Sequence, residues 1–97
     1  MTEEQISKAD DNVIFIGGKP FMNYIHGVDM QFKKGSNEVV IKARGKFISR
    51  AVDVAEYTKR ESEGVEQQMI EINTEEFKNK EGKQVNVSTI EITLAKK

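Results

Sequence analysis

The fold of this chain is constrained most by two apolar runs, each followed by a glycine-containing loop and an apolar stripe at helical spacing. The first run is residues 12–16, and Gly17 and Gly18 break it. The second run ends at Ile41, and Gly45 follows soon after. Short apolar runs bounded by glycine predict strands. Because residues 13–16 of this run are all apolar, we expect a strand buried on both faces.

Each loop leads into a predicted helix. Pro20 suits a first helical turn, where its missing N–H has no intrahelical partner to lose. The first stripe extends to Phe32, and the following lysines and Gly35 are typical of a helix C-terminus. The second helix should begin after Gly45 and run to about Ser62, with its stripe at Ile48, Ala51, Val52 and Ala55.

The C-terminal third predicts a long β-hairpin. Residues 69–72 begin one strand, residues 85–94 form the other, and residues 79–83 (NKEGK) have the composition of a turn. The apolar positions change face along both strands, which predicts a bulge or strong twist midway. The outer half of the hairpin would then leave the sheet as an arm.

The order strand–helix–strand–helix–strand–strand predicts an α+β fold, a two-layer α/β sandwich. We expect a four-stranded mixed sheet with both helices on one face. The 97 residues suffice for a single domain, residues 12–97, whose small core would gain from burial in an oligomer. Residues 1–11 are polar and acidic and predict a flexible N-terminal tail.

Several classes of function are disfavoured by composition. The chain has no cysteine, which excludes disulfides, thiolate zinc sites and cysteine nucleophiles. Its one histidine, His26, lacks partners at catalytic spacing, so a helix-surface or partly buried position is the better interpretation. We therefore predict no catalytic residues, no metal site and no cofactor. No signal peptide or membrane-spanning segment is evident, so we expect no membrane partner. We also expect no small-molecule substrate.

Charge is distributed unevenly. The formal net charge is -1, with a pI of about 5.9. Residues 33–50 nevertheless hold six cations against one carboxylate, whereas residues 61–81 hold seven carboxylates against two lysines. Such asymmetry indicates contact with nucleic acid or a membrane, although two ordinary solvated faces explain it equally well.

Two basic segments are candidate anion sites. Lys42, Arg44 and Lys46 alternate, so in an extended segment their side chains would point the same way, and Arg44 can fork onto phosphate oxygens. In the loop before the first helix, Lys19 adds charge to exposed N–H groups, although a simple tight turn accounts for this loop as well. Tyr24 and Phe47 flank these segments, and core packing is their default role, although an aromatic ring beside a basic loop can also stack on a base.

Three segments in order resemble the archaeal Alba chromatin proteins. Residues 13–24 (VIFIGGKPFMNY) resemble the opening signature of that family, and residues 40–53 (VIKARGKFISRAVD) resemble its second. Residues 87–92 (VSTIEI) resemble its last strand. The resemblance covers nearly the whole chain from Asn12 and indicates an acidic, methanogen-like variant.

This resemblance implies a fold like the C-terminal domain of the bacterial translation initiation factor three, and a homodimer. It also implies binding to the backbones of double-stranded DNA and RNA, through paired basic loops and two hairpin arms, in a cytoplasmic, chromosome-associated protein. Carried over by position, Lys83 at the hairpin tip would reach along a groove. The remaining implied contacts are phosphate contacts by Lys19, Lys42, Arg44 and Lys46, with Asn23 and Tyr24 beside them.

The sequence departs from the family where binding would be strongest. Gly18 replaces one of two loop lysines, which leaves Lys19 as the only candidate there for acetylation. Asn86 stands on the arm where relatives carry an arginine, and Ser62 replaces a phenylalanine that packs dimer against dimer. We therefore expect weaker binding than that of basic relatives, with poor cooperativity between dimers.

Three alternatives stay open. The chain could prefer RNA, or act as a ribonucleoprotein subunit, in place of compacting DNA generally. It could select particular DNA sequences. A protein-interaction module using the acidic face is a separate class, whereas an enzyme is disfavoured by the missing catalytic spacing.

Overall fold

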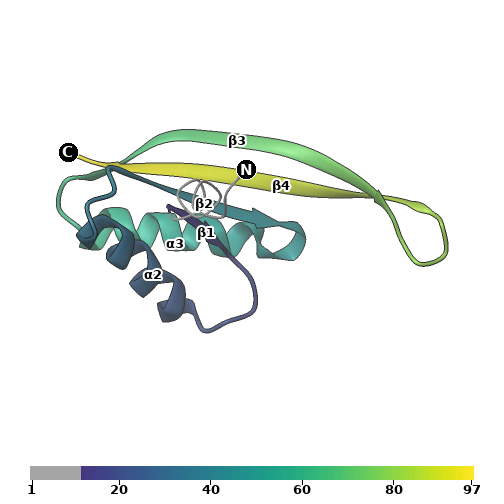
Figure 1. Ribbon diagram of the computed structural model, residues 1–97, viewed down its shortest axis with the longest axis horizontal. Coiled ribbons are helices and arrows are strands. Elements are labelled where there is room, and N and C mark those ends of the chain that lie inside the picture. The colour runs from purple at the N-terminus through teal and green to yellow at the C-terminus, as the bar shows by residue number, and fades with distance from the viewer. Residues whose placement is uncertain (1–11) are drawn as a thin grey trace, which may run out of the picture.

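The computed structural model describes residues 12–97, and the tail predicted for residues 1–11 lies outside them. Figure 1 shows how the described elements are arranged. Their order confirms the predicted strand–helix–strand–helix–strand–strand pattern. The elements are β1 (Val13–Phe15), α2 (Phe21–Lys33), β2 (Glu38–Arg44), the 3₁₀ turn η1 (Gly45–Phe47), α3 (Ile48–Glu61), β3 (Val65–Lys78) and β4 (Gln84–Lys96).

The four strands form one mixed sheet in the order β1-β2-β4-β3. β1 runs parallel to β2, as expected for strands joined through a crossover helix, and the other neighbours are antiparallel. The predicted α+β class and mixed sheet are therefore confirmed.

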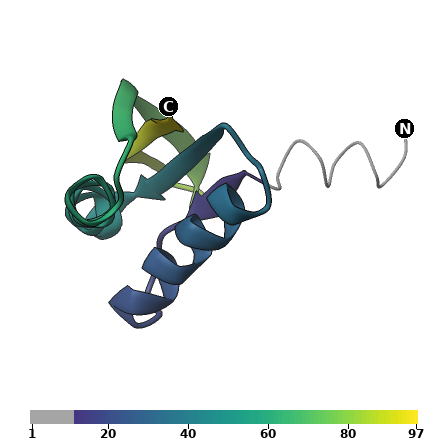
Figure 2. The same cartoon turned by 90° about the vertical axis from the view of Figure 1, so that its left-hand side faces the viewer.

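The core lies between the sheet and the two helices. On the central strands, Val39 lies opposite Leu94, and Ile41 lies opposite Ile92. These four side chains are buried, and α2 and α3 cover the face that carries them (Figures 1 and 2). The helices contribute their apolar stripes to the same core, including Ile25, Val28, Ala51 and Val54.

The opposite face of the sheet, here called the open face, carries no helix among residues 12–97 (Figure 2). One consequence is that the predicted burial of the first strand on both faces is wrong. β1 is an edge strand of three residues, and the Phe15 side chain on the open face is 66% exposed. The apolar run therefore predicted a strand correctly but did not indicate that both of its faces are buried.

The outer part of the hairpin forms the predicted arm. β2 pairs with β4 only from Glu38↔Ala95 to Arg44↔Thr89, whereas β3 and β4 stay paired as far as Lys78↔Gln84. Between Thr89 and the turn at the tip, β3 and β4 pair only with each other. This part of the hairpin extends past the helices (Figure 1).

The bulge predicted midway along the hairpin is wrong. The only shift of register between β3 and β4 in the described residues lies near the base, between Gln67 and Met69. From there Ile72↔Ile90 and Phe77↔Val85 belong to one continuous register and lie on opposite faces. The apolar positions change face because the arm lies beyond the helices, so no core holds its pairs to one side.

Candidate nucleic-acid interface

The loop between β1 and α2 is held by side chains from both helices. The Tyr24 hydroxyl on α2 accepts hydrogen bonds from the backbone N–H groups of Gly17 and Lys19, at 2.9 and 3.0 Å. From α3, Arg50 Nη1 donates to the carbonyls of Gly17 and Lys19, at 3.0 and 2.8 Å. Its guanidinium also lies 5.9 Å from the centre of the Tyr24 ring. The loop backbone is thereby fixed, while the Lys19 side chain stays exposed.

This arrangement changes what the loop can offer an anion. The N–H groups of Gly17 and Lys19 already donate to Tyr24, so they are not the free donors that the sequence indicated. What the loop presents is the charge of Lys19, with Asn23 exposed beside it on the first turn of α2. Tyr24 is 7% exposed, so it positions the loop and does not itself form part of the outer surface.

Arg50, which holds the loop that carries Lys19, was not singled out by the sequence analysis. It was counted among the cations of residues 33–50, but nothing in its spacing indicated that it contacts a loop that precedes it by more than thirty residues. The only available signal was its place in the first turns of the second helix, beside the basic loop. Its contacts depend on how α3 packs next to α2, which is a tertiary feature.

Two predicted phosphate ligands lie side by side on the open face. Alternation along β2 buries Val39, Ile41 and Ala43, so Lys42 and Arg44 project from the other face. Each of these two cations has a carboxylate counterion. Lys42 Nζ lies 3.6 Å from Glu91 Oε2, and Arg44 Nη1 lies 2.9 Å from Glu75 Oε1.

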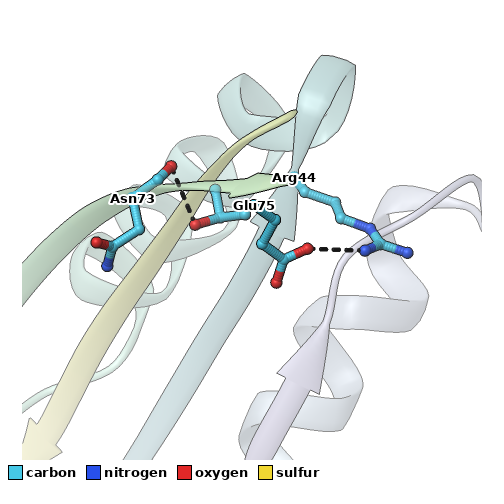
Figure 3. A network of polar contacts seen from close by, with 4 residues as sticks. Arg44, Asn73 and Glu75 are labelled. Atoms are coloured by element: carbon cyan, nitrogen blue, oxygen red, sulfur yellow. Dashed lines mark hydrogen bonds and ion pairs between the residues drawn. The ribbon is translucent and has the colours of Figure 1, made fainter. Parts of the chain in front are cut away.

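Figure 3 shows the second of these pairs, with the Arg44 guanidinium directed at the Glu75 carboxylate. Beside it, the Thr89 hydroxyl donates to the backbone carbonyl of Asn73 at 3.2 Å. Both members of the Arg44–Glu75 pair are more than half exposed, with side-chain exposures of 65% and 54%. Exposed pairs of this kind contribute about 0–1 kcal/mol, so a phosphate can compete for Arg44.

Lys46 is placed differently from Lys42 and Arg44. The extended segment ends at Arg44, because Gly45 adopts a φ of 60° that glycine accommodates without strain. Lys46 follows in the 3₁₀ turn, and its Nζ lies 5.4 Å from the centre of the Phe47 ring. Of the three cations expected to alternate along one extended segment, only Lys42 and Arg44 do so. Among residues 12–97, neither Lys19 nor Lys46 forms an ion pair.

The arm residues lie apart from this cluster. Lys83 closes the turn at the tip, where its N–H donates to Asn79 Oδ1 at 3.0 Å. Asn86 is exposed on β4 opposite Glu76, whose carboxylate accepts a hydrogen bond from Gln84 at 2.8 Å.

The described residues hold no group of three or more histidine, aspartate or glutamate side chains arranged to bind a metal ion. Neither α2 nor α3 is long and apolar enough to cross a membrane. What the geometry offers is a pair of cations with carboxylate partners on the open face, Lys42 and Arg44, and the exposed Lys19 and Lys46 in the turns before α2 and α3.

Comparison with known proteins gives a consistent result. A family model described as Alba matches residues 12–93. The DNA/RNA-binding protein Alba of Methanocella arvoryzae is 52% identical over 86 residues, which cover 88% of this chain and 90% of that protein. The DNA/RNA-binding protein Alba 1 of Archaeoglobus fulgidus is 52% identical over 88 residues, which cover 90% and 98%.

A solved structure agrees with the sequence matches. Alba from Thermoplasma volcanium matches with a TM-score of 0.81 and 46% identity, covering 88% of this chain and 100% of that chain. The chain belongs to the Alba family. The Alba match includes every predicted site residue from Lys19 to Asn86, and it confirms the resemblance found in the three sequence segments.

In this Alba domain, the hydrogen bonds from the loop between β1 and α2 to the Tyr24 hydroxyl, here called the loop clamp, predict the effect of Tyr24→Phe. Removing the hydroxyl leaves the N–H groups of Gly17 and Lys19 without their acceptor, at a cost of about 1–3 kcal/mol for partly buried groups. We expect exchange of these two amide hydrogens, measured by NMR, to become at least about five-fold faster. Amides in the centre of β2 serve as the internal control. Unchanged exchange at Gly17 and Lys19 would show that the hydroxyl does not hold the loop.

Proposed function

We propose that this chain is a non-enzymatic, homodimeric protein that binds the phosphate backbones of double-stranded DNA and RNA. The observation that carries the proposal is the set of exposed cations on and beside β2, held in place by sheet pairing and by the clamped loop. The relatives named DNA/RNA-binding protein Alba support the same chemistry. In the cell this function corresponds to a cytoplasmic, chromosome-associated protein.

The proposed phosphate contacts come from Lys19, Lys42, Arg44 and Lys46. Asn23 lies beside Lys19, and Tyr24 acts through the loop conformation. Lys83 at the arm tip extends the contact along a groove, and Asn86 adds a neutral hydrogen-bonding group. Of the four proposed phosphate ligands, Lys19 and Lys46 are the two without a carboxylate partner among the described residues, so acetylation of Lys19 would weaken attraction.

Exposed apolar residues support the homodimer. On the face of β3 that carries the core, Ile70 and Ile72 are 49% and 75% exposed, and Val52 on α3 is 40% exposed. Side chains of this size stabilise an association by up to about 1.5–3 kcal/mol each when fully buried. Dimerisation would double the number of cations available to one duplex. Ser62 offers little apolar surface for contacts between dimers, so we propose weak cooperativity.

The variant Ile72→Asp tests the dimer. A carboxylate in place of the most exposed of these side chains would have to be buried without a partner, so we expect dissociation. Sedimentation equilibrium should give twice the 11.0 kDa chain mass for the wild type and the single mass for the variant. Phe77→Asp on the arm is a matched control that should leave the mass unchanged.

The double variant Arg44→Ala, Lys46→Ala tests the basic surface. For B-DNA the logarithm of affinity falls with the logarithm of salt concentration by about 0.9 per neutralised phosphate. Loss of four cations per dimer should abolish measurable binding at moderate salt and lower the slope by about three to four. Titrations on duplex DNA, duplex RNA and single strands measure both quantities. Wild-type affinity in this variant would exclude the basic surface as the site.

Glu75→Gln tests the competition for Arg44. Neutralising the carboxylate removes a counterion that duplex phosphates must displace, worth up to about 1 kcal/mol. We expect affinity for duplex DNA to rise by up to about five-fold per protomer. Glu63→Gln makes the same charge change in the exposed connection between α3 and β3, and should have a smaller effect. Equal effects of the two variants would assign the gain to net charge alone.

A further inference from the structure

The open face of the sheet carries an aromatic ring whose role the duplex contacts do not explain. Phe15 on β1 is 66% exposed, and Lys42 Nζ lies 5.9 Å from the centre of its ring. An isolated exposed apolar side chain needs no explanation. Phe15, however, borders a depression of about 400 Å³, whose lining includes charged and polar side chains from β2, β3 and β4: Lys42, Arg44, Glu75, Thr89 and Glu91.

The lining of this depression combines three kinds of group. Phe15 supplies an aromatic face, Lys42 and Arg44 supply cations, and the two glutamates supply carboxylate oxygens. A nucleotide requires the same three kinds of partner: its base stacks on a ring, its phosphate contacts cations, and its base edge forms hydrogen bonds. In a duplex the base faces are stacked on neighbouring pairs and the Watson–Crick edges are paired. Only an unpaired nucleotide has all three features free.

We propose that the depression beside Phe15 binds one unpaired nucleotide of single-stranded RNA or DNA. The base stacks on the exposed Phe15 ring, and the flanking phosphates contact Lys42 and Arg44. This inference rests on the proposed nucleic-acid-binding function and adds single strands to its substrates. It also gives the open face a role distinct from that of Lys19 and Lys46.

The hydrogen-bonding groups around the depression favour particular base edges. Glu75 pairs with Arg44 through Oε1, and Glu91 pairs with Lys42 through Oε2, so each carboxylate keeps a second oxygen as an acceptor. The Thr89 hydroxyl donates to the Asn73 carbonyl, which leaves its oxygen as an acceptor too. A wall of acceptors favours bases that present N–H donors.

Guanine presents two adjacent donors, N1–H and the N2 amino group, and both can donate to the acceptor oxygens that line the depression. Adenine and cytosine each present one amino group. Uracil and thymine present two carbonyls around a single N–H, so carboxylates would repel them. We therefore expect guanine-rich single strands to bind tightest and uracil- or thymine-rich strands weakest.

The absence of tryptophan from the chain allows a direct test. In Phe15→Trp, the new indole is the sole tryptophan, and a stacked base should quench its fluorescence. Met30→Trp is the matched control, since Met30 is 55% exposed on α2 and does not line the depression. Short single-stranded RNA and DNA should quench Phe15→Trp and leave Met30→Trp bright. An abasic strand of the same length carries the same charge and should quench neither.

A second variant separates stacking from charge. Phe15→Leu keeps an apolar side chain but lacks an aromatic face, so affinity for single strands should fall about five-fold or more. Its affinity for duplex DNA should change less than two-fold, which also shows that the variant is folded. Single-strand affinity equal to that of the wild type, or equal quenching at both tryptophan positions, would overturn this inference alone. If the wild-type protein binds neither duplexes nor single strands, the proposed function is overturned as well.

Discussion

The pairing of β2 with β4 is the constraint on which the rest of the structure depends. Val39, Ile41 and Ala43 meet Leu94, Ile92 and Ile90 beneath the helices, and together they form the centre of the core. Because side chains alternate along a strand, this burial sends Lys42 and Arg44 to the open face. A register shift of one residue would bury both cations and expose the core. Folding and charge presentation are therefore two results of the same pairing.

The protein compensates part of the charge that it presents. Glu91 lies on β4, next to β2, and pairs with Lys42, whereas Glu75 lies one strand further away on β3 and pairs with Arg44. Duplex DNA carries one negative charge per roughly 1.7 Å of helix axis, a much denser array than two carboxylates. A duplex can therefore displace them, but binding has to exceed the energy of the pairs it replaces. In the proposed function, this is how a chain with a net charge of -1 binds a polyanion, and it is why we expect the affinity to be modest.

Much of the fold could be predicted from sequence because it depends on local patterns. Glycine and proline mark the loops, helical stripes mark α2 and α3, and the NKEGK turn marks the hairpin. The errors concern features that depend on distant neighbours. The apolar run of β1 did not reveal that Phe15 would face an uncovered side of the sheet. The change of face in the hairpin was attributed to a bulge or strong twist, whereas the register is continuous there and the arm extends beyond the core.

The features of the candidate site can likewise be separated into those that local sequence predicts and those that depend on distant neighbours. By itself the sequence determined the element order, the family resemblance and the identity of the cations, because each of these is carried by neighbouring residues. The tertiary structure alone decided which cations have counterions, since Arg44 meets Glu75 across two strands. It also decided that Tyr24 and Arg50 clamp the first loop, and that Phe15 borders the depression that includes Arg44. Packing brings these side chains together across long stretches of chain, and no local pattern records such distances.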